Sequence, residues 1–434
     1  MTIFKTSLLI DLLSESKDGE WGEASYLPDY RLMGVIRGAD FESCRLGNME
    51  NLPRRFIPKR ISERKELRTN DIVIETAGGT AGRPTGRTLL IQDSLIDQSE
   101  IPLICASFSR FLRPDESKVY APYLYWYLQY LYHSGQMGVH QIQHTGVARF
   151  QYTDFSKSTL IPIPPISIQH RIASILGSLD DKIELNRRMN ETLEQMAMAL
   201  YKHWFIDFGP FQDGEFVESE LGMIPKKWEI RSLYSMADFI NGMIFKQSDF
   251  CDRSTGLPVI RIAELNNGIT GSTNYYDASF KEKYRLNNGD ILFAWSASLG
   301  VYLWAEGQAI LNQHIFNVKE NGGLPLPILF FVLKHVVDEF MFIAASRATT
   351  MGHITIEHLE SKLILCPPAE ILKKITNQLE PLYKLILSNK IEIELIKGIR
   401  NYLLPRLLSG EIALDVVEKH VQEVMSDVNA PVRV

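Results

Sequence analysis

Few residues in this sequence have the types and spacing that catalysis requires. The glycine-rich segment Gly78–Arg87, GGTAGRPTGR, lacks the lysine and the hydroxyl with which a P-loop holds phosphate and Mg²⁺. His140 and His144 in HQIQH would suit a metal only on a helix, and the glutamate of zinc proteases does not stand between them. The carboxylates of Pro114–Lys118, PDESK, are adjacent, so they cannot reach one metal ion from separate strands.

The motifs of the common cofactor-dependent enzymes are also missing. No GxGxxG follows a predicted strand, and no GxSxG is found. Amino-methyltransferases hold the target amine with an N/D-PP-Y/F motif, whereas IPPI and CPPA carry the two prolines without the amide or the aromatic ring. The sequence therefore predicts a chain that is not itself an enzyme and has no catalytic site, metal or cofactor of its own.

The composition indicates a globular protein of two or three domains. Of the 434 residues, 45% are hydrophobic and 23% are charged, and no apolar run is long enough to span a membrane. The N-terminus lacks the cleavage site of a signal peptide. The four cysteines form no CxxC pair, which predicts reduced thiols in a cytoplasmic protein. The net charge is −6, yet residues 31–90 hold 12 Lys and Arg against 7 Asp and Glu, so basic patches are local.

The sequence contains an internal repeat, and the repeated segment includes a long predicted helix that would position any site. Aligning Pro164-Pro165 with Pro367-Pro368 sets an offset of 203 residues, and no gap is needed across about forty residues. In both copies apolar residues recur at alternating steps of four and three, with Arg400 the one misfit, which is the heptad pattern of a coiled coil. Each helix would run about 35 residues, roughly 50 Å at ~1.5 Å per residue, too long to lie on one small domain.

The same stripe position holds an asparagine in both copies, Asn186 and Asn389. A single buried asparagine costs stability but selects one register, because only one alignment lets the two amides pair. These residues are therefore the expected register determinants of the coiled coil.

Short alternating runs such as DIVIET, RTLLIQ and HIFNVKE, separated by turn residues, predict a β-rich segment before each helix. LRTNDIVI in the first segment echoes LNNGDILF in the second. The predicted fold class is α+β, with two similar β-rich domains joined by two long helices that pair as a coiled coil. If the two helices run antiparallel, the molecule is pseudo-twofold symmetric with a domain at each end. The expected parts are a first domain at 1–165, a helix at 166–204, a linker at 205–224, a second domain at 225–368, a helix at 369–405 and a tail at 406–434.

Three stretches complete the pattern: PPISIQHRIASILGSLDDKIELNRRMNETLEQMAMALYKHWFIDF, LGMIPKKWEIRSLYSMADFINGMIFKQSDF and IRNYLLPRLLSGEI. In this order and spacing, the chain resembles the specificity subunit of Type I restriction-modification systems over nearly its whole length. The resemblance implies that each β-rich segment is a target recognition domain that reads one half of a bipartite DNA sequence. It also implies that the two helices form an antiparallel coiled coil, which sets the number of unread base pairs between the halves.

The resemblance further implies a set of partners. Two methyltransferase subunits for adenine-N6 methylation, which use S-adenosylmethionine, would dock on the helices, and restriction subunits driven by ATP and Mg²⁺ would join them on double-stranded DNA. No membrane is involved. One departure is the start of the chain, which lacks a close counterpart of IPKKWEIRSL; only EWGEASYL near Trp21 is reminiscent.

Base readout needs Arg or Lys for guanine and Asn or Gln for adenine, placed on loops that reach the groove edges. Three kinds of polar loop in each half meet this requirement. In the first half the candidates are Arg37, Thr80, Arg83, Arg87, Gln141, Gln143, His144 and Arg149. In the second half they are Asn241, Lys246, Gln247, Ser296, Ser298, Asn312, Gln313, His314, Arg347, Thr349, Thr350 and His353.

Two other functions stay open at this point. A catalytic methyltransferase or nuclease would need the cofactor and amine-binding motifs that the sequence lacks. A coiled-coil scaffold that binds only protein predicts featureless domains, whereas these domains carry loops rich in Gly, Arg, Asn and Gln at corresponding places.

Overall fold

The computed structural model describes residues 4–45, 47–79, 84–143, 148–296, 298–346 and 353–427. The chain divides into two compact units: unit 1 contains Met1–Asp181 and Lys397–Val434, and unit 2 contains Lys182–Ile396. No helix in the described ranges is long and apolar enough to cross a membrane.

Unit 1 contains one four-stranded sheet, two three-stranded sheets and a two-stranded pair formed by the first strand of the chain and the strand that precedes the first long helix. The four-stranded sheet has the order β2 (Leu13–Asp18), β9 (Ser109–Pro114), β5 (Ile72–Glu75), β7 (Thr88–Leu90). The three-stranded sheets are β4 (Arg54–Pro58), β3 (Tyr30–Ile36), β8 (Leu103–Cys105), and β10 (Gln141–Gln143), β11 (Ala148–Phe150), β6 (Ala77–Gly79). Its shorter α-helices are α1 (Phe41–Arg45), α2 (Lys59–Lys65), α3 (Asp93–Asp97), α4 (Ala121–His133) and α5 (Tyr152–Ser158).

Unit 2 repeats this plan with two four-stranded sheets and two strand pairs. The sheets have the orders β16 (Asp238–Asn241), β23 (Ile315–Lys319), β20 (Ile291–Ala294), β21 (Gly300–Leu303), and β18 (Tyr275–Tyr276), β17 (Leu257–Ile260), β22 (Ala309–Leu311), β19 (Arg285–Leu286). A hairpin of β13 (Phe216–Ser219) and β14 (Gly222–Pro225) lies in the linker. The helices are α7 (Ile262–Asn267), α8 (Leu326–Ser346) and α9 (Ile356–Ser361).

The order of the sheets confirms that the two halves share one fold. The order β2-β9-β5-β7 in unit 1 corresponds to β16-β23-β20-β21 in unit 2. The parallel pairing of β3 with β8 corresponds to that of β17 with β22. Parallel neighbours need a long crossover connection, so this shared feature is a strong sign of common topology.

The beginning of the chain has a counterpart in unit 2 that sequence inspection missed. Strand β1 (Lys5–Leu8) pairs antiparallel with β12 (Leu160–Ile163), and β15 (Glu229–Ser232) pairs in the same way with β24 (Leu363–Cys366). The segment equivalent to IPKKWEIRSL is therefore at residues 5–8 and not near Trp21. Four-residue strands carry too little pattern for their pairing to be recognised from sequence.

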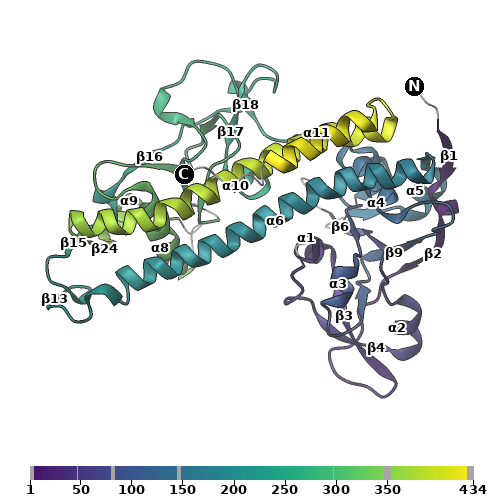
Figure 1. Ribbon diagram of the computed structural model, residues 1–434, viewed down its shortest axis with the longest axis horizontal. Helices are drawn as coiled ribbons and strands as arrows, with labels where there is room; N and C mark the ends of the chain where they lie inside the picture. The colour runs from purple at the N-terminus through teal and green to yellow at the C-terminus, as the bar shows by residue number, and fades with distance from the viewer. Residues whose placement is uncertain are drawn as a thin grey trace. The chain divides into compact units, whose positions relative to one another are not determined.

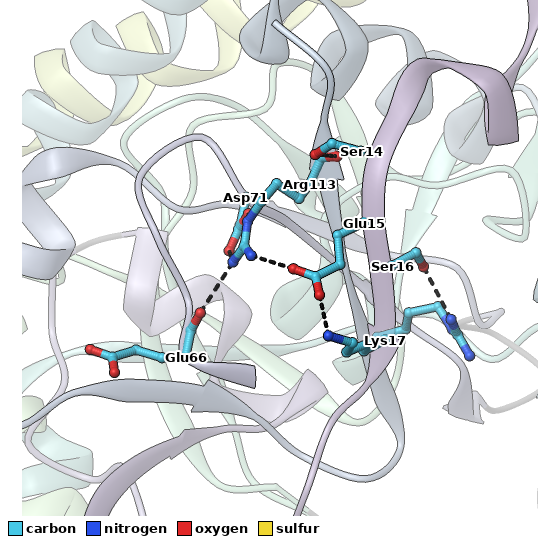
Figure 2. Close-up of polar contacts among 8 residues, drawn as sticks. Ser14, Glu15, Ser16, Lys17, Glu66, Asp71 and Arg113 are labelled. Atoms are coloured by element: carbon cyan, nitrogen blue, oxygen red, sulfur yellow. Dashed lines mark hydrogen bonds and ion pairs between the residues drawn. The ribbon is translucent and has the colours of Figure 1, made fainter. Parts of the chain in front are cut away.

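A buried ion-pair network holds the four-stranded sheet of unit 1 together. The guanidinium of Arg113 donates to Asp71 at 2.7 and 2.8 Å, to Glu15 at 2.5 Å and to the Glu66 carbonyl at 3.2 Å, as Figure 2 shows. Lys17 pairs with the same Glu15 carboxylate. The Asp71 side chain is only 1% exposed, so this carboxylate depends on its cation for stability.

Unit 2 has a reduced version of this network. Asp290, at the position equivalent to Asp71, pairs with Lys319 and accepts a hydrogen bond from Asn317 at 3.0 Å. It also accepts one from the Asn287 N–H at 3.1 Å, which closes the turn before β20. The same turn and strand are thus held by a carboxylate in both units.

The two long helices are α6 (Ile166–Phe205) and α10 (Ala369–Ser409), close to the predicted 166–204 and 369–405. Each unit contains a piece of both. In unit 1, Asp180 near the start of α6 contacts Arg400 near the end of α10; in unit 2, Trp204 at the end of α6 donates to Gln378 near the start of α10 at 2.9 Å. The helices therefore pair antiparallel, as predicted (Figure 1). A further helix, α11 (Leu414–Asp427), follows in unit 1, where Arg171 of α6 binds its Glu418.

The two stripe asparagines are buried but do not bond to each other. Asn389 donates to Asn190 at 2.9 Å, and Asn190 donates to the Ile386 carbonyl at 3.3 Å. Asn186 donates to Glu392 at 2.8 Å. The register places Asn389 opposite Asn190, one helical turn from Asn186. The prediction that the amides of Asn186 and Asn389 pair with each other is therefore wrong.

Removing the carboxylate of Asp71 should destabilise unit 1. Substitution Asp71→Ala leaves part of the Arg113 charge buried without its partner, and we expect the free energy of unfolding to fall by about 3 kcal/mol. The measurement is urea denaturation followed by circular dichroism. The control is Glu100→Ala, because Glu100 pairs with Arg54 on the surface, where the side chains are 80% and 63% exposed, and should lose less than ~1 kcal/mol. Equal losses in both variants would contradict the structural role of Asp71.

Candidate nucleic-acid interface

Several of the predicted residues of unit 2 lie together around the end of strand β20. Trp295 follows this strand, and its Nε1 donates to Oδ1 of Asn241 at 3.4 Å. The Trp295 ring lies 5.6 Å from the His314 ring and 6.2 Å from the His353 ring, measured between centroids. Ser296 forms an isolated antiparallel bridge with His353. Four segments far apart in the sequence thus meet at one aromatic ring, which sequence reasoning did not select.

The loop that carries Asn312, Gln313 and His314 is held by its backbone. The Gln313 N–H donates to the Met243 carbonyl at 3.0 Å, and the Met243 N–H donates to the Leu311 carbonyl at 2.8 Å. A Cβ on Gly242 would lie 2.2 Å from the Asn312 carbonyl oxygen, so only glycine allows this approach. The loop is consequently fixed while its side chains vary in exposure.

The polar side chains of this loop differ in their hydrogen bonds and in their exposure to solvent. Gln313 Nε2 and His314 Nε2 lie 3.2 Å apart, and Asn312 Oδ1 accepts the His314 N–H at 3.4 Å. His314 is exposed and Asn312 is buried. Lys246 and Gln247, with the neighbouring Ile244 at 75% exposed, face solvent on the loop after β16, and Ser298 is exposed after β20.

Unit 1 builds the corresponding loop with different side chains. Thr76 follows β5 as Trp295 follows β20, and its N–H donates to the Phe108 carbonyl at 2.8 Å, as the Trp295 N–H donates to the His314 carbonyl at 3.4 Å. Phe108 therefore occupies the position of His314, and its side chain is 64% exposed. Sequence analysis missed Phe108 because it looked for polar residues, and only the strand correspondence identifies it.

Two predicted arginines of unit 1 are tied to carboxylates. Arg37 donates to both oxygens of Asp40 at 2.8 Å, and this hydrogen bonding raises the pKa of Arg37. Arg87 donates to Glu75 at 2.7 and 3.0 Å and to the Gly38 carbonyl at 2.7 Å. The side chains of Arg37 and Arg87 are 41% and 20% exposed, so Arg87 in particular holds the loop at Gly38 in place.

Gln141 also has a role within the fold. Its Oε1 accepts hydrogen bonds from the N–H and the hydroxyl of Thr85 at 2.9 and 3.0 Å. Arg149, on the adjacent strand β11, is exposed. The backbone of Gln143 pairs with Ala148 at the end of the same ribbon.

The remaining predicted residues lie outside the described ranges: Thr80, Arg83, His144, Arg347, Thr349 and Thr350. Among the residues that the structure does describe, no group of three or more His, Cys, Asp or Glu side chains could hold a metal ion.

Similar proteins link the two units to DNA specificity. A family model described as Type I restriction modification DNA specificity domain matches residues 62–195 and 225–397. The chain is 29% identical over 307 residues to the Type I restriction enzyme MjaIX specificity subunit of Methanocaldococcus jannaschii, covering 67% of this chain and 69% of that protein. It is 25% identical to the Type I restriction enzyme HindI specificity subunit of Haemophilus influenzae, covering 60% and 70% of the two chains.

The fold is similar to that of the S subunit of a Type I restriction-modification system from M. genitalium. The TM-score with its crystal structure is 0.54, and the superposition covers 93% of this chain and 96% of that one. At 13% sequence identity this is a likeness of fold. The two family matches together span well over half of the sequence. The chain therefore belongs to the Type I restriction modification DNA specificity domain family.

Proposed function

We propose that this chain is the DNA-reading specificity subunit of a Type I restriction-modification complex, and that each β-rich domain reads one half of a bipartite target. The observation that carries the proposal is the repeated loop framework. In unit 1 the backbone N–H of Thr76, after β5, bonds to the loop between β8 and β9; in unit 2 that of Trp295, after β20, bonds to the loop between β22 and β23. A fixed framework with variable side chains suits a protein that reads different bases at its two domains.

Direct readout in unit 2 is assigned to the loop after β22. Gln313 has the amide that can pair with adenine, and His314 has a ring nitrogen that can reach a base edge. Residues 226–362 contain 13 Lys and Arg against 14 Asp and Glu, so the phosphate contacts depend on local cations such as Lys246. Trp295 contacts this loop through its ring and its backbone N–H, both at His314. We assign it a supporting role and assign no base contact to it.

In unit 1 we assign readout to the exposed Phe108 and Arg149. Phe108 can make an apolar contact with a thymine methyl group. Arg37 contributes through its exposed part, while Arg87 acts as a positioning residue because its guanidinium is occupied by Glu75 and Gly38. The candidates outside the described residues keep the roles proposed from the sequence.

The antiparallel helices α6 and α10 are proposed to set the unread spacer and to dock two methyltransferase subunits. Support comes from apolar side chains that the coiled coil leaves in solvent: Leu185 is 53% exposed, Met196 51% and Leu395 60%. Exposed apolar residues on a long helix pair suit a protein partner. The partners would bring S-adenosylmethionine for adenine-N6 methylation and, in restriction subunits, ATP and Mg²⁺, in the cytoplasm.

The two rival functions have less support. A scaffold that binds only protein does not account for the shared loop framework on the two domains. A catalytic methyltransferase or nuclease does not account for a sequence without the motifs that bind the cofactor or the target amine.

The purified chain alone should neither methylate nor cut DNA, and adding a cognate methyltransferase subunit should produce sequence-specific adenine methylation. Transfer of a radiolabelled methyl group to plasmid DNA measures both states. A methyltransferase subunit with its amine-binding motif mutated serves as the control. Methyl transfer by the chain alone, with contaminating subunits excluded by mass spectrometry, would contradict the proposal.

Lengthening both helices should lengthen the spacer. One matched heptad inserted after Asn186 and after Asn389 adds roughly 10 Å at ~1.5 Å per residue, or about three base pairs at ~3.4 Å each. Methylome sequencing should show a longer unread gap between unchanged half-sites. Altered half-sites with an unaltered gap would rule out this role of the helices.

Substitutions in the two equivalent loops should affect different half-sites. His314→Ala combined with Gln313→Ala should relax base preference in one half-site by ~1–3 kcal/mol, and Phe108→Ala should do so only in the other. Fluorescence anisotropy with single-base variants of the target, in the assembled methyltransferase, measures both effects. The matched control is Tyr26→Ala, an aromatic side chain that is 66% exposed and packs against Phe56 of β4. Unchanged preference in both loop variants would exclude these loops from the DNA site.

A further inference from the structure

An ion pair lies where the apolar stripe of the long helices is interrupted, in addition to the Lys182–Glu392 pair at 3.7 Å between the same two helices. Arg400, the one charged misfit in the heptad pattern of α10, binds Asp180 of α6 within unit 1. The two side chains are 18% and 19% exposed, so the pair is largely removed from water. At such a position each charge depends on the other, because an unpaired buried charge is strongly unfavourable.

Two other basic side chains of unit 1, His133 and Arg45, lie near this ion pair. His133 of α4 lies close by, but burial, followed by the charges of Arg400 and Arg45, lowers its pKa, so it stays neutral near pH 7. A neutral imidazole cannot replace Arg400 as the cation for Asp180. Arg45 of α1 is held by Glu42 at 3.4 Å and by the Thr88 carbonyl at 3.2 Å.

The repeat shows that neither charge occurs at the equivalent place in the other helix. The offset of 203 residues makes Ala197 of α6 the counterpart of Arg400, and Tyr383 of α10 the counterpart of Asp180. Both counterparts are buried in the hydrophobic core of unit 2, with Ala197 0% and Tyr383 6% exposed. The stripe is otherwise closely matched, so its apolar residues do little to distinguish one helix from the other.

This difference matters if a helix meets its own copy from a second chain. Two α6 helices paired in the same antiparallel register would place Asp180 against Ala197, without a cation. Two α10 helices would place Arg400 against Tyr383, and would also place the Asn389 amide against Ile393, the counterpart of Asn190. A pair of two α6 helices would still match Asn190 with Asn186, the counterpart of Asn389, so the charges decide against it. Only the mixed pair of α6 with α10 satisfies the charges of Asp180 and Arg400, and the same holds for Lys182 and Glu392.

We propose that the Asp180–Arg400 ion pair selects the helix partner, so that α6 accepts α10 and rejects a second α6. Connection within one chain then favours the α10 of the same molecule, because the effective concentration is higher. The partner surface at this position is therefore defined by charge: it fits an α10 helix with a cation at 400, whether from the same chain or from a second copy. This proposal is independent of DNA reading.

The test uses two full-length chains with different affinity tags, one with Asp180→Arg and one with Arg400→Asp. Each variant alone has like charges at this contact and cannot close correctly. Coexpressed, the two can exchange α10 helices, so that reversed position 180 meets reversed position 400 and the two native charges meet each other. We expect the two tags to copurify in equal amounts as a species with the mass of two chains, measured by light scattering after size exclusion.

Two controls separate partner selection from general stability. Wild-type chains with the two tags should not copurify. The double variant Asp180→Arg with Arg400→Asp should be a monomer with the thermal transition of the wild type, because the reversed pair still selects α10. If a single variant is insoluble by itself, recovery of both chains in the soluble fraction on coexpression is the supporting result.

The proposal is overturned if the complementary variants do not copurify although both are folded, or if coexpression fails to recover them. It is also overturned if the double variant fails to restore the monomer and its thermal transition. If the ion pair contributed only local stability, the double variant would regain the thermal transition of the wild type. The coexpressed single variants would then not form the exchanged dimer.

Discussion

Both units depend on the pairing of α6 with α10 through a buried, mostly apolar stripe. The hydrophobic core of unit 2 includes Ala197 and Tyr201 from α6 together with Ile375, Leu379 and Ile386 from α10. Unit 1 likewise contains the first part of α6 and the last part of α10. Unit 1 joins the two ends of the chain, Met1–Asp181 and Lys397–Val434, and the core of unit 2 joins α6 residues to α10 residues 170 or more positions later. Both units therefore depend on the register between the two helices.

Within that constraint, the two domains preserve their framework and change their surfaces. Asp71 and Asp290 hold the same turn before the central strand, although one is paired with an arginine and the other with a lysine. Arg37 with Asp40 and Arg261 with Glu264 form the same i,i+3 ion pair directly after the parallel strand. The buried carboxylates of these pairs are tolerated because each has a basic side chain as its partner.

The loops show the opposite tendency. The backbone bonds that fix Phe108 and His314 are equivalent, while the side chains differ in polarity. Backbone bonds leave the side chain unconstrained, so a loop can change its contacts without disturbing the sheet. This separation lets two copies of one fold present different chemistry.

Sequence alone determined the repeat, the two long helices and the family, and the resemblance to that family implied that the helices pair antiparallel. These features rest on heptad spacing and long-range similarity, which are local or statistical properties of the chain. The tertiary structure decided which residues face each other. Heptad spacing identifies the buried face of a helix but not the register across it, so Asn389 meets Asn190, and Arg400, a misfit by pattern, finds Asp180. The short strand at Lys5–Leu8, the carboxylate partners of Arg37 and Arg87, and the place of Phe108 depend on contacts between segments that no local pattern relates.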